Sequence, residues 1–110
     1  MHELSITQGV VEICAEKAAG RRVIAVVLEI GVLSGVVPEA VEFAFEVCTS
    51  GTLLEGARLD IERVAARGRC RGCGAEFPVQ TYYDPCPACA LYGAELLSGE
   101  ELRVRELEVE

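Results

Sequence analysis

Two Cys-x-x-Cys motifs constrain the fold of this chain more than any other feature. The first pair is Cys70 and Cys73, and the second pair is Cys86 and Cys89. Each motif places two thiolates on one tight turn, and two such turns that fold towards each other provide the four sulfur ligands of a tetrahedral zinc ion. Because four thiolates leave no open coordination position, we expect a structural zinc site rather than a catalytic one.

The alternative is that the two pairs are redox-active dithiols or disulfides, as in a thiol oxidoreductase. A redox dithiol usually stands at the start of a helix, which stabilises its thiolate. Here Gly72 and Gly74 surround the second cysteine of the first pair and suit the tight turn of a metal site. The first residues lack the basic and apolar regions of a signal peptide, so we expect a cytoplasmic location, where thiols stay reduced.

Net charge and the length of the apolar runs disfavour nucleic acid and membranes as partners. The net charge is −8 and the isoelectric point is near 4.7, so the chain as a whole repels nucleic acid. The longest apolar runs, such as residues 23–28, are too short to span a membrane. Four arginines precede the first cysteine pair or lie within it: Arg63, Arg67, Arg69 and Arg71. We interpret them as offsetting the negative charge of a zinc–thiolate centre, although a zinc-ribbon nucleic-acid-binding protein is the alternative.

Hydrophobic periodicity predicts two helices. Residues 4–20 carry apolar side chains at helical spacing, and Gly20 is a natural stop. Pro38 suits the first turn of a second helix, which ends near residues 50–52. Its apolar stripe consists of Val41, Ala44, Phe45 and Cys48. Cys14 and Cys48 both lie on apolar helical faces, so we expect buried, inert thiols.

Three further segments have the composition of strands. Residues 23–33 are rich in β-branched side chains, residues 57–62 alternate apolar and charged side chains, and residues 102–104 begin a last alternating strand. The alternation changes phase near Glu106, which predicts a bulge or the end of pairing there. We therefore expect an α+β fold with two helices on a small three-stranded sheet. Residues 1–69 and 98–110 form this domain, and residues 70–97 form an inserted, zinc-ribbon-like module.

The amino terminus contains the only histidine of the chain, at position 2. The Met1 amine, the His2 backbone nitrogen and His2 Nδ1 can form fused chelate rings around one ion, and Glu3 can add a fourth donor. A nitrogen-rich set of this kind suits Ni(II) or Cu(II) rather than Zn(II). The alternative is a solvated terminal residue without a metal-binding role.

Several stretches, taken together and in order, resemble the HypA/HybF family of nickel metallochaperones for [NiFe]-hydrogenase maturation. They are residues 1–5 (Met-His-Glu-Leu-Ser), 33–40 (Leu-Ser-Gly-Val-Val-Pro-Glu-Ala), 43–46 (Phe-Ala-Phe-Glu), the two cysteine pairs and 99–102 (Gly-Glu-Glu-Leu). The resemblance runs across nearly the whole chain. The combination of a terminal Met-His-Glu with paired Cys-x-x-Cys motifs is specific, whereas either part alone is not.

The resemblance implies a nickel carrier; because the sequence also contains no defensible Ser-His-acid, phosphate-cradling or paired-carboxylate arrangement, we do not expect an enzyme. Ni(II) would be the cargo, bound through His2 and the neighbouring amino-terminal nitrogens with Glu3 adjoining, while the four cysteines hold structural zinc. Implied partners are a nickel-handling maturation GTPase, the hydrogenase large subunit and, in some organisms, urease maturation proteins. One departure is Ala90, because the family commonly has glycine after the fourth cysteine; strain in the second turn is expected.

Overall fold

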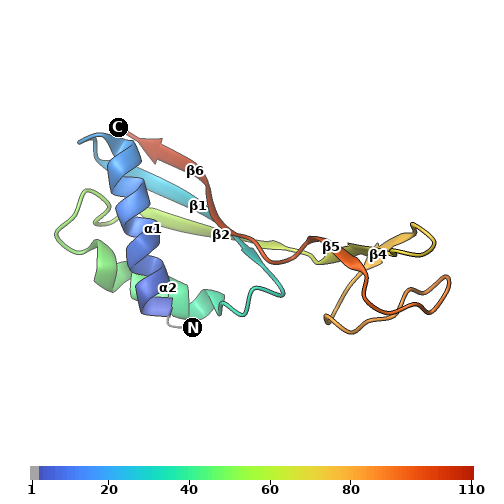
Figure 1. Ribbon diagram of the computed structural model, residues 1–110. Coiled ribbons are helices and arrows are strands. Elements are labelled where there is room, and N and C mark those ends of the chain that lie inside the picture. The colour runs from blue at the N-terminus through green and yellow to red at the C-terminus, as the bar shows by residue number, and fades with distance from the viewer. Residues whose placement is uncertain (1–2) are drawn as a thin grey trace.

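The computed structural model of the chain describes residues 3–110, so the predicted ligands Met1 and His2 lie outside the described residues. The molecule is elongated, with principal extents of 54 × 23 × 17 Å, and has helices at one end and short strands at the other (Figure 1). Among the described residues, no helix is long and apolar enough to cross a membrane. The elements in chain order are α1 (Glu3–Ala18), β1 (Val23–Gly31), α2 (Pro38–Thr49), β2 (Arg58–Val64), β3 (Arg67–Arg69), β4 (Glu76–Pro78), β5 (Glu95–Ser98) and β6 (Leu102–Val109).

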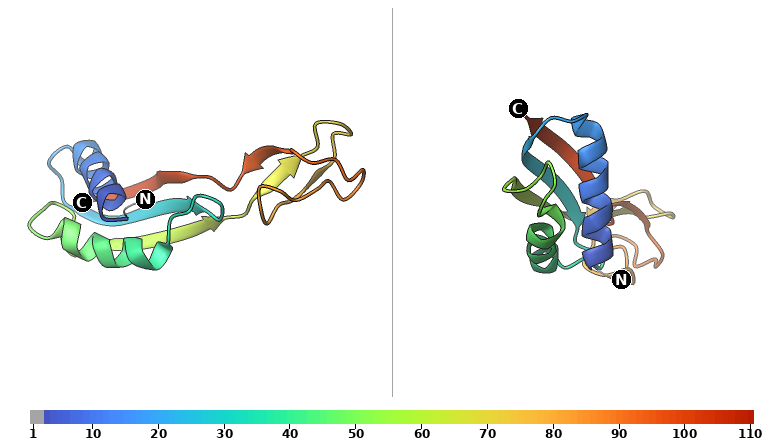
Figure 2. Two further views of the ribbon diagram at one scale, coloured as in Figure 1. Left: turned by 60° about the horizontal axis from the view of Figure 1, so that its bottom comes forward. Right: turned by 90° about the vertical axis from the view of Figure 1, so that its left-hand side faces the viewer.

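The larger sheet has the strand order β2-β1-β6, and both helices pack on one of its faces (Figure 2). Strand β1 pairs with β2 in parallel and with β6 antiparallel. Helix α2 therefore serves as the crossover between two parallel strands, a question that periodicity alone had left open. The predicted α+β fold is confirmed.

The central strand β1 explains why one face of this sheet is buried. Val26, Leu28 and Ile30 are fully buried against the helices, as the alternation of a strand requires. On the other face, Glu29 pairs with Arg103, and further exposed ion pairs join Arg58 to Asp60 and Arg105 to Glu62. Exposed pairs of this kind contribute little free energy of folding, so the buried face dominates the stability of the sheet.

The observed boundaries refine the predicted ones. Helix α1 ends at Ala18, two residues before the predicted end, because Ala19 and Gly20 adopt positive φ angles of 52° and 86°. Strand β1 ends at Gly31 rather than at residue 33. The irregularity predicted near Glu106 is confirmed: Val27 pairs with Glu106 and Leu28 with Val104, which leaves Arg105 as the extra residue of a bulge.

The second sheet has the order β4-β3-β5 and a small core of its own. Its buried residues are Ala66, Cys70, Phe77, Val79 and Cys86. Strand β3 covers residues 67–69 and β5 ends at residue 98, so the small sheet extends slightly beyond the predicted bounds of the zinc module, residues 70–97. Two of the five buried residues are cysteines of the predicted zinc site, and the apolar core that remains is very small.

The two sheets meet where β1 and the β5–β6 connection cross at very close range. A Cβ atom on Gly31 would lie 2.1 Å from the Gly99 carbonyl oxygen, and one on Gly99 would lie 2.6 Å from the Ala66 Cβ. Backbone hydrogen bonds join the same segments, from the Gly31 amide to the Glu101 carbonyl and from the Leu33 amide to the Gly99 carbonyl, both at 2.7 Å. Glycine is thus required at this crossing.

A side chain adds a second connection between the two sheets. The Tyr82 hydroxyl lies 2.6 Å from Glu100 Oε2, to which it donates, and 3.1 Å from the Leu33 carbonyl oxygen. The hydrogen bond to the Glu100 carboxylate, together with burial and the charge of Glu100, raises the pKa of Tyr82. The phenol therefore remains a donor at neutral pH and links the small sheet to the crossing.

Substitution of the crossing glycine tests this arrangement. Gly31→Ala should lower the free energy of unfolding by about 2–3 kcal/mol, because the added methyl group has only backbone to displace. Gly9→Ala is the matched control: nothing lies within 4 Å of that position in α1, so the same change should raise stability by up to about 1 kcal/mol. Urea unfolding of both variants checks the signs, and equal effects would contradict a tight crossing.

Candidate metal centre

The two cysteine turns share one hydrogen-bonding pattern. In the first, the Cys70 amide donates to the Ala75 carbonyl at 2.8 Å and the Gly74 amide donates to the Cys70 carbonyl at 3.0 Å. In the second, the Cys86 amide donates to the Leu91 carbonyl at 2.9 Å and the Ala90 amide to the Cys86 carbonyl at 2.7 Å. Each turn therefore presents both of its thiols in one direction.

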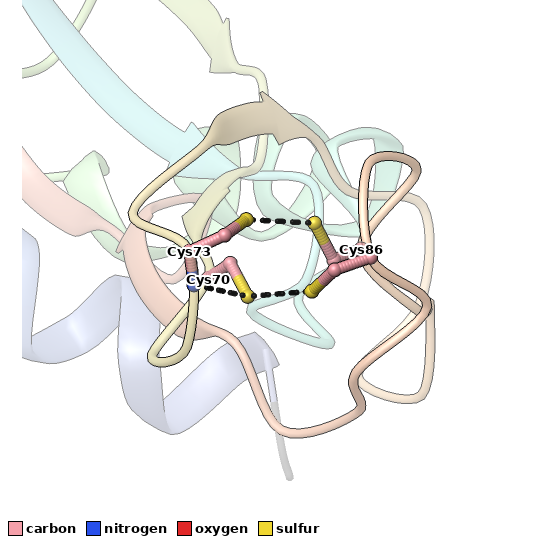
Figure 3. Close-up of side chains that lie close together, drawn as sticks. Cys70, Cys73 and Cys86 are labelled. Carbon is pink, nitrogen blue, oxygen red and sulfur yellow. Dashed lines mark hydrogen bonds between the residues drawn. The ribbon is translucent and has the colours of Figure 1, made fainter.

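The turns bring all four predicted zinc ligands together. The Sγ atoms of Cys70, Cys73, Cys86 and Cys89 all lie within 4.8 Å of one another. The Cys70 and Cys89 sulfurs are 3.5 Å apart, and the Cys73 and Cys86 sulfurs are 3.6 Å apart (Figure 3). Zn–S bonds of about 2.3 Å place tetrahedral sulfur ligands about 3.8 Å apart. The two separations are close to this distance, so the four thiols are grouped as the ligands of one zinc ion would be.

The electrostatics of the cluster favour a cation at its centre. The amides of Cys73 and Gly72, each 3.4 Å from the Cys70 sulfur, lower the pKa of Cys70 to about 6. The Leu91 amide lowers the pKa of Cys89, but hydrogen bonding to Cys70, burial and the other two sulfurs together raise it to about 12. Cys70 and Cys89 therefore do not ionise together unless a positive charge offsets their mutual repulsion.

Two of the four arginines near the cluster have partners of their own. Arg69 forms an ion pair with Glu76 at 3.4 Å, and Arg71 Nε donates to the Gly93 carbonyl at 3.0 Å. Both contacts join segments of the small sheet and its loops. They give these two side chains a structural role, which weakens the case for an open nucleic-acid patch beside the first cysteine pair.

Of the predicted nickel ligands, only Glu3 is among the described residues, and it lies in the helical part of the molecule, as do the two cysteines that were predicted to be inert. Glu3 is the first residue of α1, and its carbonyl accepts a 2.6 Å hydrogen bond from the buried Thr7 hydroxyl. Cys14 is fully buried, and burial raises the pKa of its thiol to about 11, in agreement with the predicted inert role. Cys48 is only partly buried, and its Sγ lies 4.0 Å from the Leu4 carbonyl oxygen.

The predicted strain in the second turn is confirmed at Ala90. Its φ angle is 65°, in the left-handed region, and the corresponding position of the first turn is Gly74, with a φ angle of 77°. An alanine in this conformation costs about 1–2 kcal/mol, which exceeds the entropic cost of a glycine, about 0.5–1 kcal/mol. The second turn therefore carries strain that the first turn lacks.

Relief of this strain should stabilise the zinc-loaded protein. We expect Ala90→Gly to raise the free energy of unfolding by about 0.5–1 kcal/mol and to slow zinc release to a chelator. Ala88→Gly, an exposed position in the same turn without a positive φ angle, is the control and should be neutral or slightly destabilising. Thermal unfolding and chelator competition measure both, and a gain in both variants would count against strain at Ala90.

Comparison with known proteins places the chain in a family. A family model described as "Hydrogenase/urease nickel incorporation, metallochaperone, hypA" matches residues 1–109. The hydrogenase maturation factors HypA of Geobacter sulfurreducens and Geobacter metallireducens are 70% and 71% identical to this chain over 110 residues, with full coverage of both proteins.

Solved structures agree with the sequence comparison. The solution structure of the Ni metallochaperone HypA from Helicobacter pylori superimposes with a TM-score of 0.71 at 26% identity, covering 99% of this chain and 97% of that one. A second solution structure of a HypA protein gives a TM-score of 0.70 at 28% identity, covering 100% and 97%. The chain therefore belongs to the HypA family of nickel metallochaperones for hydrogenase maturation.

Proposed function

We propose that this chain binds Ni(II) through the Met1 amine and the backbone and imidazole nitrogens of His2, with Glu3 adjoining, and transfers it to a maturation partner. The observation that carries the proposal is the family match, which begins at residue 1 and so includes this terminal stretch. The donor types support it, since nitrogen-rich sets suit Ni(II). The chain acts as a carrier, and transfer proceeds by exchange of ligands, one donor at a time.

We further propose that Cys70, Cys73, Cys86 and Cys89 hold one structural zinc ion. The sulfur separations support this assignment, because all four sulfurs lie within 4.8 Å of one another and two pairs are close to the spacing of a tetrahedral zinc site. In this division, residues 70–97 are the zinc module, and residues 1–69 with 98–110 carry nickel. Four soft sulfurs retain one ion, while the nitrogen-rich terminus releases the other.

The proposed partners follow from the family rather than from any contact within the chain. They are the nickel-handling GTPase of hydrogenase maturation and the hydrogenase large subunit, with urease maturation proteins where these occur. We place the protein in the cytoplasm, where zinc-binding thiols stay reduced. Neither nucleic acid nor a membrane is a partner in this scheme, and the protein is not an enzyme.

A nickel titration tests the terminal site. The native chain should bind Ni(II), whereas His2→Ala and a form extended before Met1 should each bind at least about tenfold more weakly, because both lose a ligand. Affinity should also fall at acidic pH, since protons compete for the amine and imidazole. Zinc content serves as the control and should be the same in all three. Equal nickel affinity of the three forms would show that the terminal chelate is wrong.

A second substitution tests the zinc site. Cys70→Ala should abolish zinc binding and disorder the strands β3, β4 and β5, because metal binding supplies the folding free energy of so small a core. The sheet β2-β1-β6 should persist, since its core is separate. Cys48→Ala is the matched control and should retain zinc. Metal analysis measures the zinc content, and amide NMR spectra show which strands remain ordered. Full zinc content in Cys70→Ala would contradict the four-thiolate assignment.

A further inference from the structure

Helix α2 carries two apolar stripes, and only one of them is buried by the chain. The first stripe, which includes Val41 and Phe45, faces the core. The second is centred on Phe43 and Val47, with the partly buried Ala40 beside them and the buried Ala44 at its border with the first stripe. Phe43 is 74% exposed and Val47 is 60% exposed. A phenylalanine left this exposed on an ordered helix is unusual and points to an interaction surface.

The second stripe forms one wall of a groove. The groove has a volume of about 590 Å³ and lies where the first turn of α1 crosses α2 at a steep angle (Figure 2). Glu3 and Leu4 of α1 form the other wall, and Leu4 is 49% exposed. Because Glu3 directly follows His2 in sequence, an occupant of the groove would lie beside the proposed nickel ligands.

The charge around the groove is of one sign. Glu39, Glu42 and Glu46 are exposed on α2 and follow one another along the edge of the apolar stripe, and Glu3 lies on the opposite wall. Helix α2 contains no lysine or arginine. Within residues 3–110, none of these four carboxylates takes part in an ion pair. The groove therefore combines an apolar floor with an unneutralised acidic rim.

We propose that this groove docks a basic amphipathic helix of a protein partner. Apolar side chains of that helix enter between Phe43, Val47 and Leu4, and its flanking lysines or arginines pair with the rim carboxylates. A second copy of this chain is a poor occupant, because a symmetric contact would place the acidic rims against each other. The proposal rests on the proposed function in one respect: docking here positions the nickel acceptor beside the terminal chelate.

The occupant is defined by chemistry, so a designed probe tests it. The probe is a labelled helical peptide with leucines at helical spacing flanked by lysines; its comparison peptides are a scrambled isomer and a version with glutamates in place of the lysines. The first peptide should bind the zinc-loaded chain and shift the amide signals of Glu3, Leu4 and residues 39–47. Equal binding of either comparison peptide, or shifts located elsewhere, would overturn the proposal.

Matched substitutions distinguish peptide binding in the groove from nonspecific attraction to an acidic protein. Phe43→Ser should weaken peptide binding at least about tenfold, as loss of a central aromatic anchor does, whereas Tyr83→Ser, at an 82% exposed aromatic of the small sheet region, should not. Replacement of Glu42 and Glu46 together by Gln should weaken binding and flatten its salt dependence. The same double change at Glu12 and Glu16, exposed on α1, removes equal charge and should have little effect.

A measurement in cells connects the groove to maturation. In cells that lack the native protein and grow on limiting nickel, Phe43→Ser should lower hydrogenase activity several-fold relative to Tyr83→Ser, while the purified variant keeps native nickel affinity and zinc content. Undiminished activity would overturn the proposal, as would self-association of the native chain that Phe43→Ser abolishes. If nickel binding by the native chain fails while selective peptide docking persists, the terminal chelate is wrong and the docking surface stands.

Discussion

The small sheet depends on a positive charge that offsets the mutual repulsion of four closely spaced cysteine sulfurs. The sulfurs of Cys70, Cys73, Cys86 and Cys89 lie within 4.8 Å of one another, a spacing that four negative charges do not hold without a cation. The neighbouring strands β3 and β4 have only three residues each. Cys70 and Cys86 are themselves part of the five-residue core. With so small an apolar core, metal binding by these four cysteines would supply part of the folding free energy of this region.

The larger sheet does not depend on the metal, but it fixes where the metal-bound region sits. Its central strand β1 is buried over Val26, Leu28 and Ile30 and continues to Gly31, where the backbone of Gly99 crosses within van der Waals range. Since the crossing is made of backbone hydrogen bonds and glycines, it leaves little room for adjustment. The hydrogen bond from Tyr82 to Glu100 then joins the loop between the cysteine pairs to the same crossing.

Patterns within short stretches of sequence predicted the helices, the central strand and the four-cysteine cluster. The cysteine spacing, the helical periodicity of α1 and α2 and the β-branched composition of β1 each lie within a short window, and each predicted its element. The parallel pairing of β1 with β2 and the crossing at Gly31 depend on segments far apart in sequence, which periodicity does not connect. Strands as short as β3 carry no periodic signal. The stripe through Phe43 was missed because the core-facing stripe already accounted for α2 as an amphipathic helix.

The two proposed metal sites differ in what their surroundings allow the ion to do. Zinc held by thiolates on two turns of matching hydrogen-bond pattern loses all four ligands only if the small sheet opens, so its release is coupled to local unfolding. In the proposed terminal nickel site, by contrast, the donors would leave singly as an incoming ligand replaces them. Fast release requires that the acceptor already be in place, because an ion freed into solvent is lost. A groove whose wall includes Glu3 meets that requirement through position: a partner helix docked against Phe43 would hold the acceptor beside the proposed terminal donors before the ion leaves them.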